Sequence, residues 1–171
     1  MEEKLDYETK SQSYKKLALR VLLDNTQDAS NLGAALRVCD ALCVEYLYCS
    51  GDEPKQINKK IRRVARGADS HVPYHYEVDL VACIEKLKME GFTVLALEIT
   101  TSSETLQNVD FEQFSKVALV IGAENLGISD AVIQACDFAV HIPMYGKGFS
   151  MNVTCALSIA LFEIVRQKNK Q

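Results

Sequence analysis

The chain lacks the cysteine patterns of metal-binding and disulfide-rich proteins. None of its six cysteines forms a C-x-x-C pair, and Cys39 and Cys43, which would share a helix face, have no histidine near them in the sequence. We therefore expect no metal site. Because each cysteine lies in an apolar segment, all six are expected to be reduced core residues of a cytosolic protein.

Targeting signals and linkers are also missing. The first ten residues, MEEKLDYETK, are charged and contain no apolar stretch like that of a signal peptide, which predicts a cytoplasmic location. Only three prolines occur, and no internal repeat or low-complexity segment divides the 171 residues. We expect a polar arm or short helix at 1–16 and a single domain at 17–171.

The apolar segments that are present alternate between two periodicities. Short runs rich in β-branched residues alternate with helical patterns, which is typical of βαβ units and a parallel sheet. Strands are expected at 17–25, 44–50, 72–78, 92–97, 117–121 and 138–142. Helices are expected at 31–42, 80–90, 129–135 and 150–168. The predicted fold is a single α/β domain with about six mostly parallel strands flanked by helices.

The expected loops lack both common nucleotide-binding fingerprints. In parallel α/β sheets, ligands bind beyond the carboxyl ends of the strands. The loops expected there are 24–31, 98–103, 122–127 and 143–148, and none of them fits G-x-G-x-x-G or G-x-x-x-x-G-K-[ST]. A dinucleotide-binding Rossmann domain and a P-loop NTPase are therefore poorly supported.

Residues 142–165 form the most distinctive stretch of the sequence. They begin as a strand end, continue as a glycine-rich loop and finish as a helix, with no charged residue between Lys147 and Glu163. Polar residues interrupt the apolar run before it reaches the length of a membrane span. A helix that is apolar on every side is expected to be buried at the centre of a domain. Ser150 is its expected N-cap and would leave backbone N–H groups facing the loop at 146–148, which suits a polar binding site. The alternative is an ordinary core helix that happens to be capped by serine.

Two further segments place polar groups beside glycines and alanines. Asn31 is a plausible N-cap for the helix NLGAALR, and the small neighbours of Arg37 favour a partly buried guanidinium suited to binding phosphate. An ordinary solvated arginine is the alternative. Glu124 follows a buried strand directly and needs a partner, whereas a simple strand-to-helix turn capped by Ser129 would leave Glu124 unexplained.

Basic residues concentrate in one segment, although the formal net charge of the chain is −4. Residues 55–66, KQINKKIRRVAR, contain six basic residues and no acidic one. On a helix they would lie opposite an apolar stripe, which suits either a solvated amphipathic helix or a contact with RNA phosphates. The candidate RNA-binding residues are Lys55, Lys59, Lys60, Arg62, Arg63 and Arg66. Arg20 is a weaker candidate.

Three motifs together resemble those of one enzyme family. They are N-x-G-A-x-x-R at 31–37, I-G-x-E-x-x-G-[IL] at 121–128 and I-P-M…S-M-N-V-[ST] at 142–154. In this order and at this spacing they are similar to the motifs of the SpoU-type RNA ribose 2′-O-methyltransferases, a family of the SPOUT superfamily. The resemblance covers nearly the whole chain. One departure is Met151, where leucine is common in the family, and this is a mild exchange.

The resemblance implies an enzyme that uses S-adenosylmethionine to methylate a ribose 2′-hydroxyl of tRNA or rRNA. It also implies a deep trefoil knot within about 117–165 and a homodimer in which Arg37 of one subunit approaches the cofactor of the other. Arg37 would bind a phosphate and stabilise oxyanion charge, and the general base is unassigned. The implied catalytic residues are Arg37, Asn31, Glu124, Ser150 and Asn152. The implied cofactor-binding residues are Leu97, Gly122, Ile142, Met144 and Met151.

Two other functions fit the same motifs less well. One is a non-catalytic RNA-binding or assembly protein with the same fold, and the other is a related knotted methyltransferase that modifies bases. The intact set of motif residues argues against the first. The Asn31…Arg37 and Ser150…Asn152 pairs of the motifs favour the ribose enzymes over the second. The sequence does not identify the RNA or the nucleotide that is modified.

Overall fold

The computed structural model describes residues 17–51, 56–148 and 150–169. Seven strands form its sheet: β1 (Leu19–Leu23), β2 (Tyr46–Cys49), β3 (Tyr74–Tyr76), β4 (Thr93–Leu97), β5 (Glu104–Thr105), β6 (Val117–Ile121) and β7 (Phe138–His141). The helices are α1 (Ala29–Ala41), α2 (Lys59–Ala65), α3 (Leu80–Met89), α4 (Asp130–Ala135) and α5 (Val153–Lys168), with 3₁₀ turns at Ala68–Ser70, Leu106–Asn108 and Phe111–Gln113. The predicted arm at 1–16 lies outside the described residues.

All strand pairings in the described sheet are parallel, in the order β3-β2-β1-β6-β4-β7-β5. This confirms the predicted single α/β domain, and all six predicted strands are present. The seventh strand, β5, has only two residues and pairs at the edge with β7. A strand this short carries no periodic pattern, so the sequence could not predict it. The trefoil knot stays a prediction from the resemblance.

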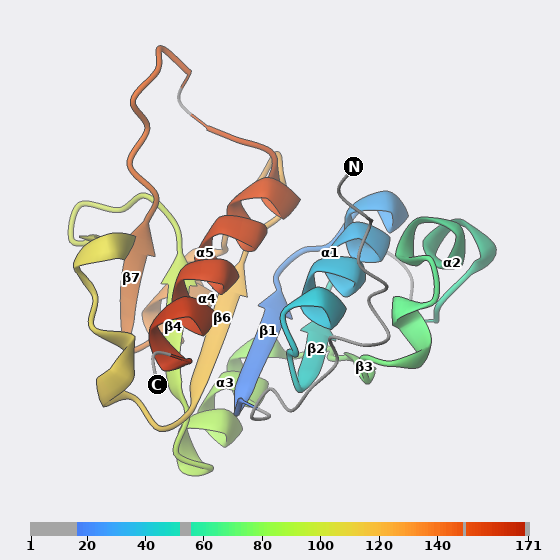
Figure 1. Ribbon diagram of the computed structural model, residues 1–171, viewed down its shortest axis with the longest axis horizontal. Helices are drawn as coiled ribbons and strands as arrows, with labels where there is room; N and C mark the ends of the chain where they lie inside the picture. The colour runs from blue at the N-terminus through green and yellow to red at the C-terminus, as the bar shows by residue number, and fades with distance from the viewer. Residues whose placement is uncertain (1–16, 52–55, 149, 170–171) are drawn as a thin grey trace, which may run out of the picture.

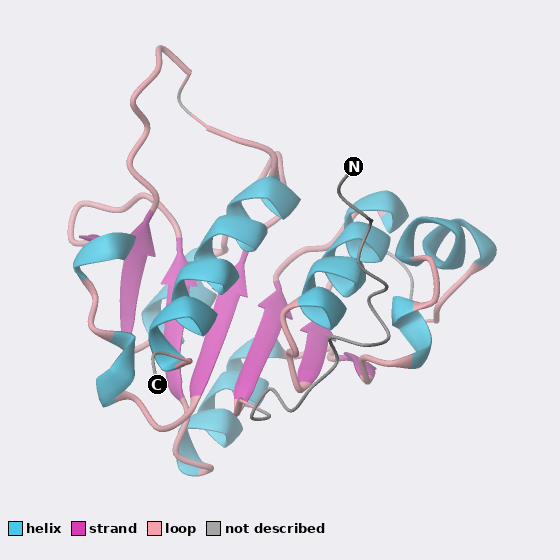
Figure 2. Ribbon diagram, in the orientation of Figure 1, coloured by secondary structure: helices cyan, strands magenta, loops and turns pink. Residues whose placement is uncertain are grey.

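Helices cover both faces of the sheet (Figures 1 and 2). One apolar core packs α1 and α5 against one face, and a second packs α3 and α4 against the other. β6 lies in the middle of the sheet and all five of its residues, VALVI, are buried. A continuous apolar run is typical of a parallel strand that is covered on both sides, which explains why the predicted bounds of this strand are correct.

The start of α5 corrects one prediction. The N-cap is Asn152, whose Oδ1 accepts hydrogen bonds from the Thr154 N–H (2.9 Å) and the Cys155 N–H (3.4 Å). Ser150 was the wrong choice, because Met151 and Asn152 do not enter the helix and the first free N–H groups are those that Asn152 reaches.

The start of α1 corrects a second prediction. The helix begins at Ala29, and Asp28 is its N-cap, accepting a hydrogen bond from the Ser30 N–H at 2.8 Å. Asn31 therefore lies inside the first turn. Its side chain is free from the capping role that the sequence suggested and points to a different partner, described below.

The sequence predicts that α5 is buried on every side, and the structure shows that this prediction is wrong. Leu157, Leu161 and Ile164 pack into the core, whereas Ile159 and Phe162 are 44% and 60% exposed. Most of α5 lacks charged residues because the helix has two apolar faces, and only one of these faces packs against the sheet. No helix in the described part of the chain is long and apolar enough to span a membrane.

The prediction for the cysteines is only partly correct. Four of the six are buried, but Cys43 and Cys155 are exposed. Cys43 lies beyond the end of α1 with a φ of 55°, so it does not share a helix face with Cys39. Burial raises the pKa of Cys49 to about 11 and that of Cys136 to about 12, so these thiols stay protonated. Within the described residues, no group of three or more histidine, cysteine or acidic side chains is placed to hold a metal ion.

Candidate active site

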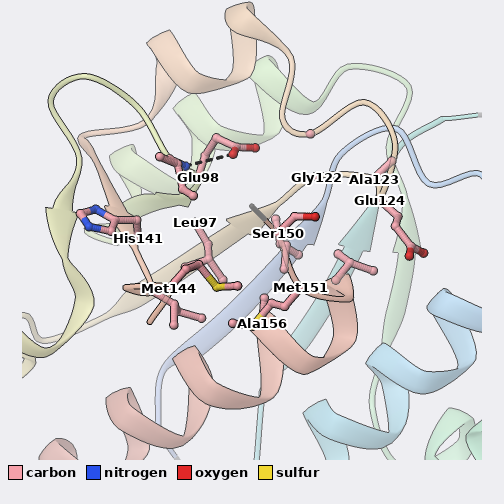
Figure 3. Close-up of a pocket in the computed structure, with 15 residues that line it drawn as sticks. Leu97, Glu98, Gly122, Ala123, Glu124, His141, Met144, Ser150, Met151 and Ala156 are labelled. Carbon is pink, nitrogen blue, oxygen red and sulfur yellow. Dashed lines mark hydrogen bonds between the residues drawn. The ribbon is translucent and has the colours of Figure 1, made fainter. Parts of the chain in front are cut away.

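A pocket of about 280 Å³ opens at the carboxyl ends of β4, β6 and β7. The loops after these three strands meet the start of α5 there (Figure 3). This is the edge of the sheet at which a parallel α/β fold binds ligands. All five residues predicted to bind a cofactor line the pocket: Leu97, Gly122, Ile142, Met144 and Met151. Leu97 and Met151 are 54 positions apart in the sequence, and the fold brings them into one wall of the pocket.

The loop after β6 forms one side of this pocket through its backbone. The Ala123 N–H donates to the Gly127 carbonyl (3.2 Å) and the Gly127 N–H donates to the Ala123 carbonyl (2.9 Å), which closes the loop on itself. A Cβ at Gly122 would lie 2.0 Å from the carbonyl carbon of Gly127, so only glycine fits. Gly127 has a φ of 63°, where glycine is unstrained. The glycines thus hold a tight loop with its backbone against the cavity.

Glu98, the first residue after β4, was missed by the sequence analysis. Its Oε1 accepts from the Ile99 N–H at 3.0 Å and its Oε2 from the Ile128 N–H at 3.2 Å, so the carboxylate joins two loops of the pocket. The signal that could have found it is the one that indicated Glu124, a carboxylate directly after a buried strand.

His141, at the end of β7, also lines the pocket and was also missed. Its Nδ1 lies 3.0 Å from the Ser103 hydroxyl, and that hydroxyl donates to the Thr100 carbonyl at 3.0 Å. Its Nε2 lies 3.5 Å from the Thr105 hydroxyl, so the imidazole is held between a loop residue and an edge-strand residue.

Asn31 and Glu124 come together beside the main pocket. Asn31 Nδ2 donates to Glu124 Oε2 at 3.5 Å, a long contact to an exposed carboxylate, so Glu124 has a partner although it is not buried. Both side chains line a second, smaller cavity that shares the wall at 121–124 and Val153 with the first one. Two cavities that share these lining residues can hold two molecules close to each other, as a group-transfer reaction needs.

Asp24 ties the loops beneath this second cavity together. It is only 4% exposed, and its Oδ2 accepts from both the N–H (2.8 Å) and the hydroxyl (2.7 Å) of Ser129. Its Oδ1 accepts from the Ser50 hydroxyl at 3.1 Å. Ser129 does stand at the N-cap position of α4, but its side chain bonds Asp24 and not the helix. The loops after β1, β2 and β6 are therefore fixed to one buried carboxylate.

Arg37 is not in this pocket. Its side chain is exposed and lines neither cavity, so the expectation of a partly buried guanidinium at the pocket mouth is wrong for a single chain. It lies over an apolar groove between α1 and α5, next to Val38 and Phe162. Of the other predicted catalytic residues, Ser150 lines the main pocket and Asn152 acts as the N-cap of α5.

The basic segment forms a helix, as expected, with its charges in solvent. Ile61 and Ala65 of α2 are buried, and the described basic residues are all exposed: Lys59, Lys60, Arg62, Arg63 and Arg66. Lys55 lies outside the described residues. Lys60 reaches Asp28 (3.1 Å) at the rim of the second cavity. Arg20 is a poor candidate, because its guanidinium is bonded to Glu45 and Glu90 and packs 4.3 Å from the centre of the Phe92 ring.

Comparison with known proteins agrees with this geometry. The model of the SpoU rRNA Methylase family matches residues 18–162. The chain belongs to this family. Among its relatives, the 23S rRNA (guanosine-2′-O-)-methyltransferase RlmB of Pseudomonas aeruginosa is 35% identical over 150 residues, which cover 88% of this chain and 59% of that protein. The RlmB of Ralstonia nicotianae is 36% identical, with 88% and 59% covered. This family member thus spans about three fifths of the length of these curated relatives.

Solved structures of the family superpose on most of this chain. The TrmH/SpoU tRNA modifying enzyme of A. aeolicus has a TM-score of 0.81 and 31% identity, with 91% of this chain and 78% of that chain covered. The SpoU methyltransferase AviRb of Streptomyces viridochromogenes, in complex with the cofactor AdoMet, has a TM-score of 0.80 and 26% identity, with 92% and 60% covered. The SpoU-type fold therefore extends over the described chain.

Proposed function

We propose that this SpoU family member transfers the methyl group of S-adenosylmethionine to a ribose 2′-hydroxyl of tRNA or rRNA. The observation that carries the proposal is the pocket, which brings the five predicted cofactor residues from three separate loops into one wall. The names of the relatives support it, since RlmB is a guanosine-2′-O-methyltransferase of 23S rRNA and AviRb was solved with AdoMet.

The residues present fit this cofactor. Leu97, Met144 and Met151 offer apolar surface to an adenine and a methionine chain, and the glycine loop presents backbone groups that any side chain at Gly122 would displace. When bound, the cofactor supplies a methyl group on a positively charged sulfur. The lining holds two carboxylates, Glu98 and Glu124, and neither lysine nor arginine, which suits a cation.

The adjoining cavity would hold the acceptor ribose. Glu124 and the amide of Asn31 offer an acceptor and a donor for ribose hydroxyls, and the two side chains contact each other at 3.5 Å. Ser150 lies on the cofactor side of the shared wall. In-line transfer depends mainly on such positioning, which can contribute on the order of 7–11 kcal/mol to lowering the barrier.

A homodimer would complete the site. Arg37 lies over the same apolar groove as Phe162, and Ile159 continues the exposed apolar surface of α5. Exposed apolar surface of this kind marks contact sites between proteins. A second copy packed there would bury Phe162 and carry its own Arg37 toward this chain's pocket, where a permanently charged guanidinium can bind phosphate and stabilise a developing oxyanion.

The decisive experiment is a methyl-transfer assay. The protein is incubated with labelled S-adenosylmethionine and total tRNA or rRNA, and the modified nucleotide is mapped. We expect label at a 2′-oxygen, and label on a base would instead assign the chain to the base-modifying knotted enzymes. Absence of cofactor binding in calorimetry would favour a non-catalytic RNA-binding or assembly protein.

The free cysteines and the absence of a disulfide among the described residues agree with a proposed cytoplasmic location.

A further inference from the structure

Glu98 is held rigidly at the edge of the main pocket. Its backbone N–H donates to the Val140 carbonyl at 3.0 Å, which extends the β4–β7 pairing by one residue. Its two carboxylate oxygens accept from the Ile99 and Ile128 N–H groups. Because the main chain and the side chain are both fixed, the negative charge has a defined place in the wall (Figure 3).

The carboxylate also packs against the glycine loop. A Cβ added at Gly127 would lie 2.7 Å from Glu98 Oε2, so this oxygen occupies the space that any other residue at position 127 would need. Gly127 in turn backs onto Gly122, whose backbone faces the pocket. Glu98 therefore lines the pocket directly beside the loop that would bind the cofactor.

The charge of Glu98 has no cationic partner in the described part of the chain. None of the ion pairs there includes Glu98, and no lysine or arginine lines the pocket. Two backbone N–H groups stabilise the carboxylate without neutralising it. A half-buried charge is screened less than one in open water, so its field acts on whatever enters the pocket.

We infer that Glu98 is the positioning residue through which the pocket prefers the cationic cofactor to its neutral product. S-adenosylmethionine carries a sulfonium, and S-adenosylhomocysteine, the product of methyl transfer, has an uncharged sulfur in its place. An uncompensated carboxylate attracts the first ligand more than the second and thereby favours exchange of product for fresh cofactor. The inference rests on the proposed function, since it assumes that this pocket holds the cofactor.

The test measures the dissociation constants of both ligands by calorimetry for the wild-type protein and for Glu98→Gln. The amide keeps one acceptor oxygen but loses the charge. We expect affinity for S-adenosylmethionine to fall about tenfold and affinity for S-adenosylhomocysteine to change less than about twofold, because the missing attraction is Coulombic. Glu98→Asp keeps the charge, so it should retain the preference even where both ligands bind more weakly. Glu104→Gln, an exposed change on neighbouring β5, serves as the matched control.

The possible outcomes distinguish failure of the inference about Glu98 from failure of the proposed function. Equal weakening of both ligands in Glu98→Gln would reduce Glu98 to a support for the loop and overturn the inference, as would unchanged binding of both. In either case the wild-type protein still binds the cofactor and the proposed function stands. If the wild-type protein bound neither ligand, the proposed function would fail and the inference with it. Thermal unfolding of each variant checks that the fold is intact.

Discussion

Thr26, in the loop after β1, carries a buried hydroxyl that makes no hydrogen bond. The residue is 5% exposed, and within the described residues its Oγ1 is the buried side-chain oxygen or nitrogen left without a partner. Its backbone is well held, because its N–H donates to the Ser50 carbonyl at 2.8 Å. A buried polar group without a partner costs about 1–3 kcal/mol of stability. The unpaired hydroxyl of Thr26 therefore lowers the stability of the folded protein.

We predict that Thr26→Val stabilises the protein. Valine has nearly the same shape and removes the unpaired hydroxyl, so the free energy of unfolding should rise by about 1 kcal/mol. Urea denaturation followed by circular dichroism measures the change. Thr26→Ser keeps the hydroxyl and should show no such gain. A loss of stability in the valine variant would mean that the hydroxyl has a bonding partner after all.

Residues at this scale also show what the sequence could and could not predict. Glu124 was predicted to need a partner, and Asn31 supplies it. Glu98 follows the same pattern and could have been found in the same way. His141 could not, because its place in the pocket depends on Ser103 and Thr105, which reach it from a loop and an edge strand without a recognisable sequence pattern.

Among the elements, the starts of α1 and α5 show where local prediction is ambiguous. Each helix begins within a short segment that holds more than one good N-cap residue: Asp28, Ser30 and Asn31 for α1, and Ser150 and Asn152 for α5. Capping preference alone cannot choose among them, since aspartate, serine and asparagine rank nearly equally. β6 has no such ambiguity, because its apolar run is bounded by Lys116 on one side and Gly122 on the other.

We predict that the cap of α1 gives the protein a pH-dependent stability. The Ser30 N–H and the Lys60 ammonium hold the pKa of Asp28 below its ordinary value. A lowered pKa stabilises the folded state above the unfolded-state pKa, and the contribution is lost as the pH falls through the folded-state pKa. Asp28→Ala should therefore cost about 1 kcal/mol at pH 7 and less near pH 3.

Urea denaturation at both pH values measures this difference. Asp28→Asn is the matched control, because asparagine caps a helix about as well as aspartate but does not titrate. It should cost little at pH 7, and its stability relative to that of the alanine variant should not depend on pH. A penalty for Asp28→Ala that persisted unchanged in acid would contradict the ionised cap.

α2 supports a prediction about RNA. Lys59, Arg62, Arg63 and Arg66 are exposed, and each RNA phosphate that they neutralise would release counterions. Changing these four residues to glutamine should weaken binding of tRNA or rRNA and lower the slope of log K against log salt by about 0.7–0.9 for each phosphate that is no longer neutralised. Fluorescence anisotropy over a range of salt concentrations measures the slope. As a control, Lys86→Gln, on α3 at the other face of the sheet, should leave the slope unchanged. An unaltered slope in the fourfold variant would make α2 an ordinary solvated helix.

At the scale of the whole molecule, the exposed apolar face of α5 is the feature that the sequence could not predict. Nothing local distinguishes the apolar face of α5 that meets the sheet from the face that stays exposed, since both are free of charge. Arg37 was expected to be partly buried because its neighbours in the sequence are small and apolar. In the structure it lies over the groove beside Phe162, outside both cavities of its own chain.

The last prediction tests whether two subunits share each site. Arg37→Ala should keep its affinity for S-adenosylmethionine and lose methyl transfer, and Glu124→Ala should also be inactive. If Arg37 acts on the pocket of the partner, a mixture of the two inactive variants forms heterodimers in which one of the two sites has both residues. Half of the dimers would be mixed, so activity should recover to about a quarter of the wild-type value per protomer, as expected for a closed two-fold dimer.

The variants are mixed under conditions that allow exchange of subunits, and methyl transfer is measured. The Arg37→Ala/Glu124→Ala double variant mixed with either single variant should recover nothing. Absence of recovery in the first mixture, with heterodimers demonstrated, would place Arg37 and Glu124 of one chain in the same site.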